Sequence, residues 1–303
     1  MNVLPESNKS PMISILGSGI VGASVGKGLM KLGNKTIFYD VNRRKVDEFN
    51  SLGYKATSDL NAAIRNSEIS FICVPTPTVQ KKIDLSYVND VTKKLAKALH
   101  EKNCYHLVVV KSTVLPNTTE KIIIPLLERY SKKTVGKSIG VCSNPEFLTE
   151  INRSWTNDSE FSVGFFEEPF IVIGALDKKS GDKLEAVYRR ISAPIVRTNL
   201  RTAEMMKYAL NCALACRISY WNEIFCICQK LEVDSMTVAQ TVGMDKRIGK
   251  YGTIHGKAFG GKCLPKDLKA FISFSRKLSY EPKLLQAVEE INARIASQYG
   301  VRE

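Results

Sequence analysis

The sequence lacks four signals that would each point to a particular class of protein. None of its eight cysteines forms a CxxC pair, and its three histidines, His100, His106 and His255, are scattered. These counts argue against a disulfide framework and predict no metal site. No apolar run approaches the roughly 18 residues that cross a bilayer, and the start MNVLPESNKSP is too polar for a secretory leader. We expect a cytoplasmic protein with reduced cysteines and a flexible tail over residues 1–11.

Acidic residues are few relative to basic ones. The 303 residues carry a formal net charge of +14, and 44% are apolar and 24% charged, which is typical of a globular chain of about two domains. The lysines occur in dispersed pairs such as Lys81-Lys82 and Lys132-Lys133, without an arginine-rich arm or an aromatic stacking motif. A dispersed positive surface is usually only solvated, so we predict neither a nucleic-acid nor a membrane partner.

Short β-rich runs alternate with helical patterns in the first part of the chain. Alternation at this spacing indicates parallel strands joined by crossover helices. The predicted strands are 12–17, 35–40, 68–74, 106–111, 138–143 and 170–175, and the predicted helices are 20–32, 42–51, 85–99, 118–130 and 182–191. The fold class is therefore α/β, with a doubly wound parallel sheet.

The pattern becomes helical after Pro194. Residues 202–232 contain no Gly or Pro and many good helix formers, which predicts one helix about 45 Å long. Further helices are predicted at 234–242, 265–278 and 282–298. We predict a sheet domain over 1–199 and an all-α domain over 200–303 with the long helix as its spine. Long helices with apolar residues on more than one side often bury the surplus face against a second copy, so we expect a homodimer.

The run GSGIVG ends the first predicted strand and begins the first predicted helix. In this context the pattern predicts the dinucleotide-binding turn of a Rossmann-like domain. Gly17 permits the tight turn, Gly19 lets a pyrophosphate approach the backbone, and Gly22 allows close helix–strand packing. The helix N-terminus, with Ile20 and Val21, supplies N–H groups and a partial positive charge.

Asp40 ends the second predicted strand, where a carboxylate accepts the ribose hydroxyls of the cofactor. Because a carboxylate there repels a 2′-phosphate, the predicted cofactor is NAD and not NADP. Arg43 and Arg44 nearby weaken this preference a little. The alternative is a glycine turn that binds nothing.

The segment GKAFGGKCLPKD places a thiol after a glycine turn. Pro265 suits the first turn of the helix that follows, so Cys263 is expected at the N-terminal end of that helix, between Lys262 and Lys266. Neighbouring cations and a helix N-terminus lower the pKa of a thiol, which predicts an activated nucleophile. The alternative is a small buried residue at a helix start.

Lys207 and Asn211 lie four residues apart on the predicted long helix and so share a face. The next positions on this face, Leu214 and Ile218, are apolar. A lysine and an amide on an otherwise apolar face predict a polar cavity. The alternative is an exposed pair near the helix end, because lysines are usually exposed.

The chain resembles the UDP-glucose/GDP-mannose dehydrogenase family of nucleotide-sugar 6-dehydrogenases. The matching blocks, in family order, are GSGIVG, CVPTPT, KSTV, NPEFLTE, AEMMKYALN, ISYWNE, DKRIG and FGGKCLPKD. They extend over nearly the whole chain. The resemblance implies a fold like that of the 6-phosphogluconate dehydrogenases. It also implies NAD-dependent oxidation of the C6 alcohol of a nucleotide sugar, such as UDP-glucose, to a uronic acid.

The resemblance also assigns roles to four residues around the thiol. Cys263 resembles the nucleophile that captures the aldehyde as a thiohemiacetal and then carries a thioester. Lys207 resembles the cation that steadies the oxyanion, with Asn211 beside it. Asp267 resembles the partner of that lysine and of a bound water. All four residues stand at matching positions in this sequence.

Further assignments follow from the same resemblance. Glu150 matches the carboxylate linked to thioester hydrolysis, and Thr113 matches the hydroxyl near the attacking water. Arg247 resembles a sugar-contacting arginine that is often presented across a dimer interface. The other implied substrate contacts are Phe147, Leu148, Phe259 and Gly260, and the other implied cofactor contacts are Pro75, Thr76, Ser112 and Lys266.

The sequence departs from the family pattern at three places. Ile151 stands where the family usually has glycine, and Phe170 stands where it has an arginine. We expect these changes to alter the pocket around the hydrolytic carboxylate or the choice of sugar. The chain ends at Glu303, where family members continue into another α/β domain that binds the nucleoside diphosphate, so we expect that domain to be absent.

Two alternatives to a nucleotide-sugar dehydrogenase stay open. A β-hydroxyacid dehydrogenase has similar architecture and oxidises an alcohol once, without a thiol. A shortened NAD-binding module would act without catalysis, or would need a separate nucleotide-binding partner.

Overall fold

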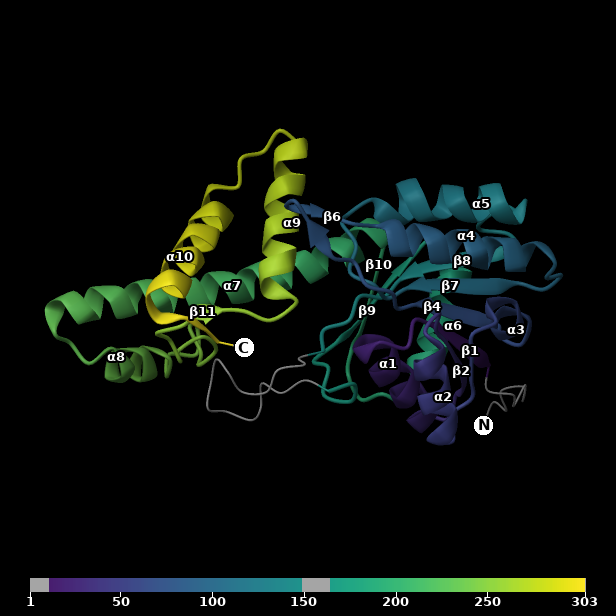
Figure 1. Ribbon diagram of the computed structural model, residues 1–303, viewed down its shortest axis with the longest axis horizontal. Coiled ribbons are helices and arrows are strands. Elements are labelled where there is room, and N and C mark those ends of the chain that lie inside the picture. The colour runs from purple at the N-terminus through teal and green to yellow at the C-terminus, as the bar shows by residue number, and fades with distance from the viewer. Residues whose placement is uncertain (1–10, 149–163, 303) are drawn as a thin grey trace, which may run out of the picture. The chain divides into compact units, whose positions relative to one another are not determined.

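The computed structural model describes residues 11–148 and 164–302, which divide into two compact units (Figure 1). The described residues of the first, the sheet unit, are 11–76, 85–146 and 168–204. Those of the second, the helical unit, are 77–84, 147–148, 164–167 and 205–302. The domain boundary that the sequence predicts near residue 200 stays a prediction.

The sheet unit is built on one eight-stranded sheet. Its strands are β1 (Met12–Leu16), β2 (Lys35–Tyr39), β3 (Ala56–Thr57), β4 (Ile69–Ile72), β7 (His106–Val110), β8 (Ile139–Ser143), β9 (Ile171–Ala175) and β10 (Ile195–Thr198). They lie in the order β10-β9-β8-β7-β4-β1-β2-β3. Across the sheet, the six neighbouring strands β3, β2, β1, β4, β7 and β8 are parallel. This arrangement corresponds to the strand order 3-2-1-4-5-6 of dinucleotide-binding folds. The predicted doubly wound α/β fold is confirmed.

The last two strands differ from the predicted parallel pattern. Strand β9 pairs antiparallel with β8, and β10 then pairs parallel with β9. Helix α6 (Lys178–Tyr188) makes the crossover between these two strands. The long stretch of chain between β8 and β9 lets the chain enter the sheet from the opposite end, so no helical crossover is needed there.

Helices cover both faces of the sheet (Figure 1). They are α1 (Ile20–Lys31), α2 (Arg43–Ser51), α3 (Leu60–Arg65), α4 (Ser86–His100), α5 (Ile124–Ser131) and α6. Val108 and Val110 of β7 form one core with Leu95 of α4. On the other face, a Cβ added to Gly26 of α1 would lie 2.3 Å from the Phe38 ring. Because both faces are buried, the central strands are continuous apolar runs.

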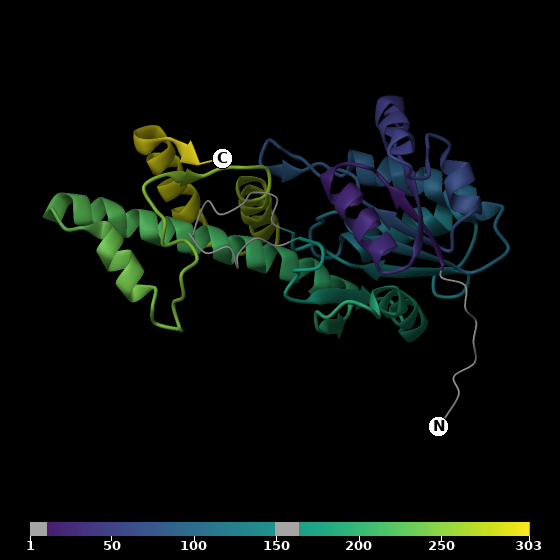
Figure 2. The same cartoon turned by 90° about the horizontal axis from the view of Figure 1, so that it is seen from below.

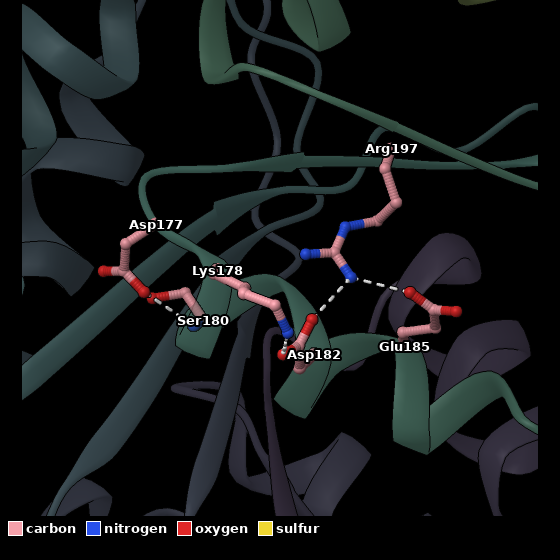
Figure 3. Close-up of polar contacts among 6 residues, drawn as sticks. All are labelled: Asp177, Lys178, Ser180, Asp182, Glu185 and Arg197. Carbon is pink, nitrogen blue, oxygen red and sulfur yellow. Dashed lines mark hydrogen bonds and ion pairs between the residues drawn. The ribbon is translucent and has the colours of Figure 1, made fainter.

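Ion pairs connect the edge strand β10 to helix α6 (Figure 3). Arg197 of β10 donates from one guanidinium nitrogen to Asp182, at 3.2 Å, and to Glu185, at 2.6 Å. Asp177 caps the same helix, since its carboxylate accepts from the Ser180 N–H at 2.7 Å. These contacts are exposed, so each ion pair contributes little stability by itself, and the cap is the stronger local signal for where α6 begins.

The predicted helix 118–130 begins with a π-helical turn, η1 (Thr119–Ile123), and continues as α5. The Ile124 N–H donates to the Thr119 carbonyl five residues earlier. Pro125 lacks the N–H that an α-helix would direct at the Lys121 carbonyl, which favours the wider turn. The Thr119 N–H donates to the Glu204 carboxylate at 2.8 Å, so a buried acid stabilises the start of this turn.

The helical unit is organised along α7 (Leu200–Leu231). The residues of α7 from Met205 onward belong to this unit, and the predicted long helix is confirmed. The other helices are α8 (Ser235–Val242), α9 (Leu264–Lys277) and α10 (Lys283–Tyr299), and short strand pairs are formed by β5 (Thr78–Val79) with β6 (Lys82–Ile83) and by β11 (Ala258–Phe259) with β12 (Val301–Arg302). Ile218, Leu268 and Val288 pack in one core. In Figure 2 the yellow α10 crosses the direction of the green α7, and the Ser219 hydroxyl of α7 donates to the Val288 carbonyl of α10 at 3.3 Å. Among the residues described, no helix combines the length and apolarity needed to cross a membrane.

Replacing Glu204 tests the buried acid at the start of η1. Burial raises the pKa of Glu204 from its ordinary 4.5 to about 7, although hydrogen bonds from Thr119 and Asn117 lower it. The folded protein therefore holds this proton more tightly than the unfolded chain, and stability falls as the pH rises from about 4.5 to about 7. Glutamine does not titrate, so the pH-dependent fall in the free energy of unfolding should be smaller in Glu204→Gln than in the wild type by up to about 3 kcal/mol. Urea denaturation at pH 5 and pH 8 measures this difference.

The matched control is Glu48→Gln, which removes an exposed carboxylate on α2. This variant should keep the pH dependence of the wild type. An unchanged pH dependence in Glu204→Gln would show that Glu204 is ionised throughout this range.

Candidate functional site

The glycine turn after β1 has the shape that a dinucleotide requires. Gly17 has φ +102°, and a Cβ there would lie 2.7 Å from the Cys73 carbonyl oxygen; a Cβ on Gly22 would lie 1.9 Å from the Gly17 carbonyl oxygen. No atom lies within 4 Å of the Cβ position of Gly19, which is the N-cap of α1. The helix N-terminus therefore faces open space at Gly19, where a pyrophosphate fits.

The turn lies where the strand order reverses. β1 and β4 are neighbours, and the chain leaves β1 and β4 toward opposite edges of the sheet, which opens the crevice that holds a cofactor. The Ser112 hydroxyl donates to the Val74 carbonyl at 2.7 Å and so fixes the loop with exposed Pro75 and buried Thr76. Thr113 follows Ser112 and is partly exposed.

Asp40 is held for hydrogen bonding at the end of β2. Its Oδ2 accepts from the Ser18 N–H at 2.9 Å and from the Ser18 hydroxyl at 2.8 Å, and its Oδ1 accepts from the Asn42 N–H at 2.9 Å. Burial raises the pKa of Asp40, but these hydrogen bonds outweigh it and lower the pKa below its ordinary value. The carboxylate is ionised at neutral pH and can accept from ribose hydroxyls. Ile20 and Val21, exposed and partly exposed, continue the turn into α1.

A buried lysine, which the sequence analysis did not single out, connects the KSTV and NPEFLTE blocks. Lys111 is fully buried and donates to the Asn144 side-chain oxygen at 3.2 Å. The Tyr188 hydroxyl donates to the same oxygen at 2.7 Å, and the Asn144 amide donates to the Val172 carbonyl at 2.7 Å. The sequence signal for this residue was a lysine directly after the apolar run LVVV of β7, because a side chain at that place lies at the buried carboxyl edge of the sheet.

The thiol of the helical unit lies where the sequence predicts it. Cys263 is the N-cap of α9, its side chain does not cap the helix, and Pro265 is in the first turn. The residue is exposed, so the alternative of a small buried residue is wrong. An exposed thiol at the N-terminal end of a 14-residue helix is in the place that the sequence predicts for a nucleophile.

A buried polar cluster lies one turn behind the thiol. Asp267 is four residues after Cys263 and is 1% exposed. Its carboxylate accepts from the Asn211 amide at 2.6 Å and pairs with the Lys266 ammonium. Lys207 and Asn211 are both buried, so the alternative of an exposed pair on α7 is wrong. The structure thus brings α7 and α9 together through polar side chains.

Lys207 is also in contact with an aromatic ring. Its ammonium lies 5.5 Å from the centre of the Phe147 ring, a distance at which a cation is attracted to the ring face. Phe147 and the partly buried Leu148 come from the NPEFLTE block, and Glu150 and Ile151 of the same segment lie outside the described residues. The structure therefore places Lys207 beside Phe147, which is one of the predicted substrate contacts.

Two asparagines that the sequence analysis did not single out fix the loop before Cys263. The Asn222 amide donates to the Lys257 carbonyl, and its oxygen accepts from the Gly256 N–H, both at 2.8 Å. Asn292 does the same for Phe259, at 2.8 Å and 3.1 Å. Each asparagine replaces the backbone pairing that an irregular loop lacks, and the loop is held from α7 and from α10.

Three further predicted contacts have different surroundings. Phe259 is buried in the core of the helical unit, and a Cβ on Gly260 would lie 2.5 Å from the Val301 side chain of β12. These two residues have structural roles in packing. Arg247 lies on the surface and pairs with Asp245 at 2.6 Å, and within the helical unit it is not part of the cluster around Asp267. Phe170, at the start of β9, is partly buried in the sheet unit.

The chain matches a described protein family over most of its length. Residues 50–192 match the UDP-glucose/GDP-mannose dehydrogenase family, NAD binding domain, and residues 201–294 match the central domain of the same family. The chain is 36% identical to GDP-mannose 6-dehydrogenase of Pseudomonas aeruginosa, over 93% of this chain and 68% of that protein. It is 33% identical to UDP-glucose 6-dehydrogenase AglM of Haloferax volcanii, over 92% of this chain and 69% of that protein.

A solved structure gives the same result. A UDP-glucose dehydrogenase from Pyrobaculum islandicum superposes with a TM-score of 0.87 and 32% identity, and the match covers 97% of this chain and 70% of that chain. The resemblance found in the sequence is confirmed, and so is NAD as the cofactor.

Replacing Gly19 tests the cofactor turn without disturbing the fold. Its backbone conformation, with φ −66° and ψ −173°, suits any residue, and its Cβ position is open, so Gly19→Ala should unfold at the same temperature as the wild type. The added methyl group enters the space for the pyrophosphate and should weaken NAD binding by about tenfold or more, measured by calorimetric titration.

Gly22→Ala provides the contrast, since its methyl group would collide with the Gly17 carbonyl. This variant should lose both thermal stability and NAD binding. NAD affinity unchanged in Gly19→Ala would place the dinucleotide elsewhere.

Proposed function

Because the chain belongs to the UDP-glucose/GDP-mannose dehydrogenase family of NAD-dependent dehydrogenases, we propose that it oxidises the C6 alcohol of a nucleotide sugar to a uronic acid. The observation that carries this proposal is the cluster in the helical unit. An exposed thiol at the start of α9 lies one turn before a buried Asp267 that binds Asn211 of α7. A single oxidation of an alcohol does not need a nucleophile.

Turning a primary alcohol into an acid removes two hydrides, and bound NAD accepts one in each oxidation. After the first oxidation the Cys263 thiolate adds to the aldehyde carbon, a C–S bond forms, and the oxygen takes up a proton to give a thiohemiacetal. Loss of that proton and of the second hydride leaves a thioester on Cys263. Water then attacks the carbonyl carbon, the C–S bond breaks, and the thiolate and the carboxylic acid are released.

The polar residues behind the thiol suit the charges that develop in these steps. Lys207 and Asn211 would donate to the oxyanion of each tetrahedral species, because a buried cation and an amide stabilise such charge more strongly than water does. Asp267 orients the Asn211 amide, and its carboxylate, which also pairs with Lys266, would accept from a bound water. Glu150, which lies outside the described residues, would serve as the base for hydrolysis, with Thr113 near the water.

The cofactor would bind the glycine turn of the sheet unit. Gly17, Gly19 and Gly22 would bind the pyrophosphate together with the N–H groups of Ile20 and Val21, and Asp40 would accept from the ribose. We propose cofactor contacts also for Pro75, Thr76, Ser112 and Lys266. Phe147, Leu148, Arg247, Phe259 and Gly260 remain proposed substrate contacts.

We propose a UDP-glucose-like substrate. The curated relatives act on GDP-mannose or UDP-glucose by name, so both nucleotide sugars belong in the assay. NADH absorbance with each compound would identify the base and the sugar. Two NADH per uronic acid would support the four-electron reaction, and one NADH per product would favour a β-hydroxyacid dehydrogenase.

Replacing the thiol is the direct test of the mechanism. Cys263→Ser should lower uronic acid formation by about a thousandfold or more, since a hydroxyl is a much weaker nucleophile than a thiolate. NAD affinity should not change, because the glycine turn is intact. The control is Cys104→Ser, which removes the other exposed cysteine and should retain full activity.

Unchanged acid formation in Cys263→Ser would contradict the covalent mechanism. A wild-type chain that binds NAD but forms no NADH with any nucleotide sugar would favour the non-catalytic module, or a subunit that needs a nucleotide-binding partner.

We also propose that the chain forms a homodimer through α7. Tyr220, Ile227 and Leu231 are 53%, 50% and 66% exposed, and their spacing of seven and then four residues places them on one stripe of the helix. Light scattering at micromolar concentration should give the mass of two chains. Ile227→Asp should shift the mass toward one chain, because a carboxylate cannot be buried without a partner, whereas Lys230→Asp outside the stripe should not. A monomeric wild type would contradict the proposal.

A further inference from the structure

The helical unit contains a basic hollow that the proposed oxidation does not use. Its volume is about 330 Å³, and it lies between the β5–β6 hairpin, α9 and α10. Figure 1 shows the hairpin beside α9. Five cations line it, namely Lys81, Lys82, Lys269, Arg276 and Lys277, and the one lining carboxylate is Glu289.

The positive charge of this hollow is only partly neutralised. Lys81 lies 3.6 Å from Glu289, and Arg276 pairs with Glu281 at 2.9 Å. In the described part of the chain, no carboxylate lies within ion-pair distance of Lys82, Lys269 or Lys277. Three lysines that have no acidic partner in this part of the chain therefore line one concave surface, and their combined positive potential attracts an anion to it.

The hollow lies on a different face of α9 from the thiol. An α-helix turns about 100° per residue, so Lys269, Ser273 and Arg276 share one face, and Arg276 lies nearly opposite Asp267. Buried Ile272 forms the floor of the hollow. An anion bound there would not contact the residues proposed for sugar oxidation, and the site is independent of that reaction.

The hairpin holds Lys81 in an uncommon conformation. Gln80 and Lys81 at its tip have φ of +48° and +62°, the left-handed values that a two-residue hairpin turn requires and that Asn and Gly adopt more easily. The Thr78 hydroxyl at the base of the hairpin donates to the Lys266 carbonyl of α9 at 3.1 Å. The turn therefore holds Lys81 at the hollow, opposite the cations of α9.

We propose that this hollow binds the phosphate chain of a small ligand, a pyrophosphate or the corresponding part of a nucleotide. Its volume is at the lower end of the range for small-molecule pockets, which suits a compact polyanion. Lysines bind phosphate as point charges, and an arginine adds paired N–H donors. Single-stranded nucleic acid is the less suitable occupant, because it needs aromatic side chains on which bases stack and none lines the hollow.

The test uses the full chain and inorganic pyrophosphate at low ionic strength. Saturating NAD is present, so that the glycine turn is occupied. Calorimetric titration should show binding to the wild type. The double variant Lys269→Gln/Lys277→Gln should bind about tenfold more weakly or worse, because two charge-assisted contacts are lost. Added salt should weaken wild-type binding in the same assay.

The matched control is Lys230→Gln/Lys246→Gln, which removes the same charge at two exposed positions outside the hollow. It should bind pyrophosphate within about twofold of the wild type. UDP and ATP are titrated in the same way. For each ligand, the loss of affinity in Lys269→Gln/Lys277→Gln is compared with the loss in the control variant. If this difference is larger for UDP or ATP than for pyrophosphate, the ligand is a nucleotide. If the difference is equal, the hollow recognises the phosphate chain alone.

Three results would overturn the proposal. The first is no pyrophosphate binding by the wild type, and the second is equal weakening in both double variants, which would show only a general effect of net charge. The third is a labelled single-stranded oligonucleotide that loses affinity in Lys269→Gln/Lys277→Gln but is not displaced by pyrophosphate. That result would assign the surface to nucleic acid.

Discussion

The helical unit depends on the burial of one carboxylate. Asp267 is almost fully removed from water, and an ionised group there is tolerated only with hydrogen bonds and an opposite charge. Asn211 from α7 and Lys266 from α9 supply them. Because removing one partner of a buried ion pair costs about 3–5 kcal/mol, the cluster constrains how α7 and α9 pack. The same constraint fixes Cys263 one turn earlier on α9, so the position of the proposed nucleophile follows from the packing of the acid.

Features that repeat along the chain were predictable from the sequence. Six strands of the doubly wound sheet and the long helix α7 follow from apolar runs and helical periodicity, whereas the short edge strands β3 and β10 were not predicted. The glycine turn follows from its position between a strand and a helix. The thiol at the start of α9 follows from Pro265 and the glycines before it. In each case the determining contacts lie within a few residues, so the local sequence contains the physical cause.

Features that depend on distant contacts were not predictable. Asn222 and Asn292 look like ordinary polar positions on amphipathic helices, yet each bonds to a loop more than thirty residues away in the sequence. The hydrogen bonds from Ser18 to Asp40 and from Lys111 to Asn144 likewise join residues that only the sheet brings together. The antiparallel direction of β9 has the same origin, since no local signal in an apolar run of five residues sets the direction in which it pairs.

The glycine turn of the sheet unit and the polar cluster of the helical unit therefore differ in how we expect them to respond to substitution. The glycine turn is assembled from residues close in sequence, and its function depends on the absence of side chains, so a single methyl group is enough to change it. The cluster around Cys263 joins residues 56 positions apart in the sequence, and its function depends on polar groups that are kept from water. Substitutions there act through packing as well as chemistry, which means that a loss of activity at Asn211 or Asp267 identifies a chemical role only when the fold of the helical unit is shown to be intact.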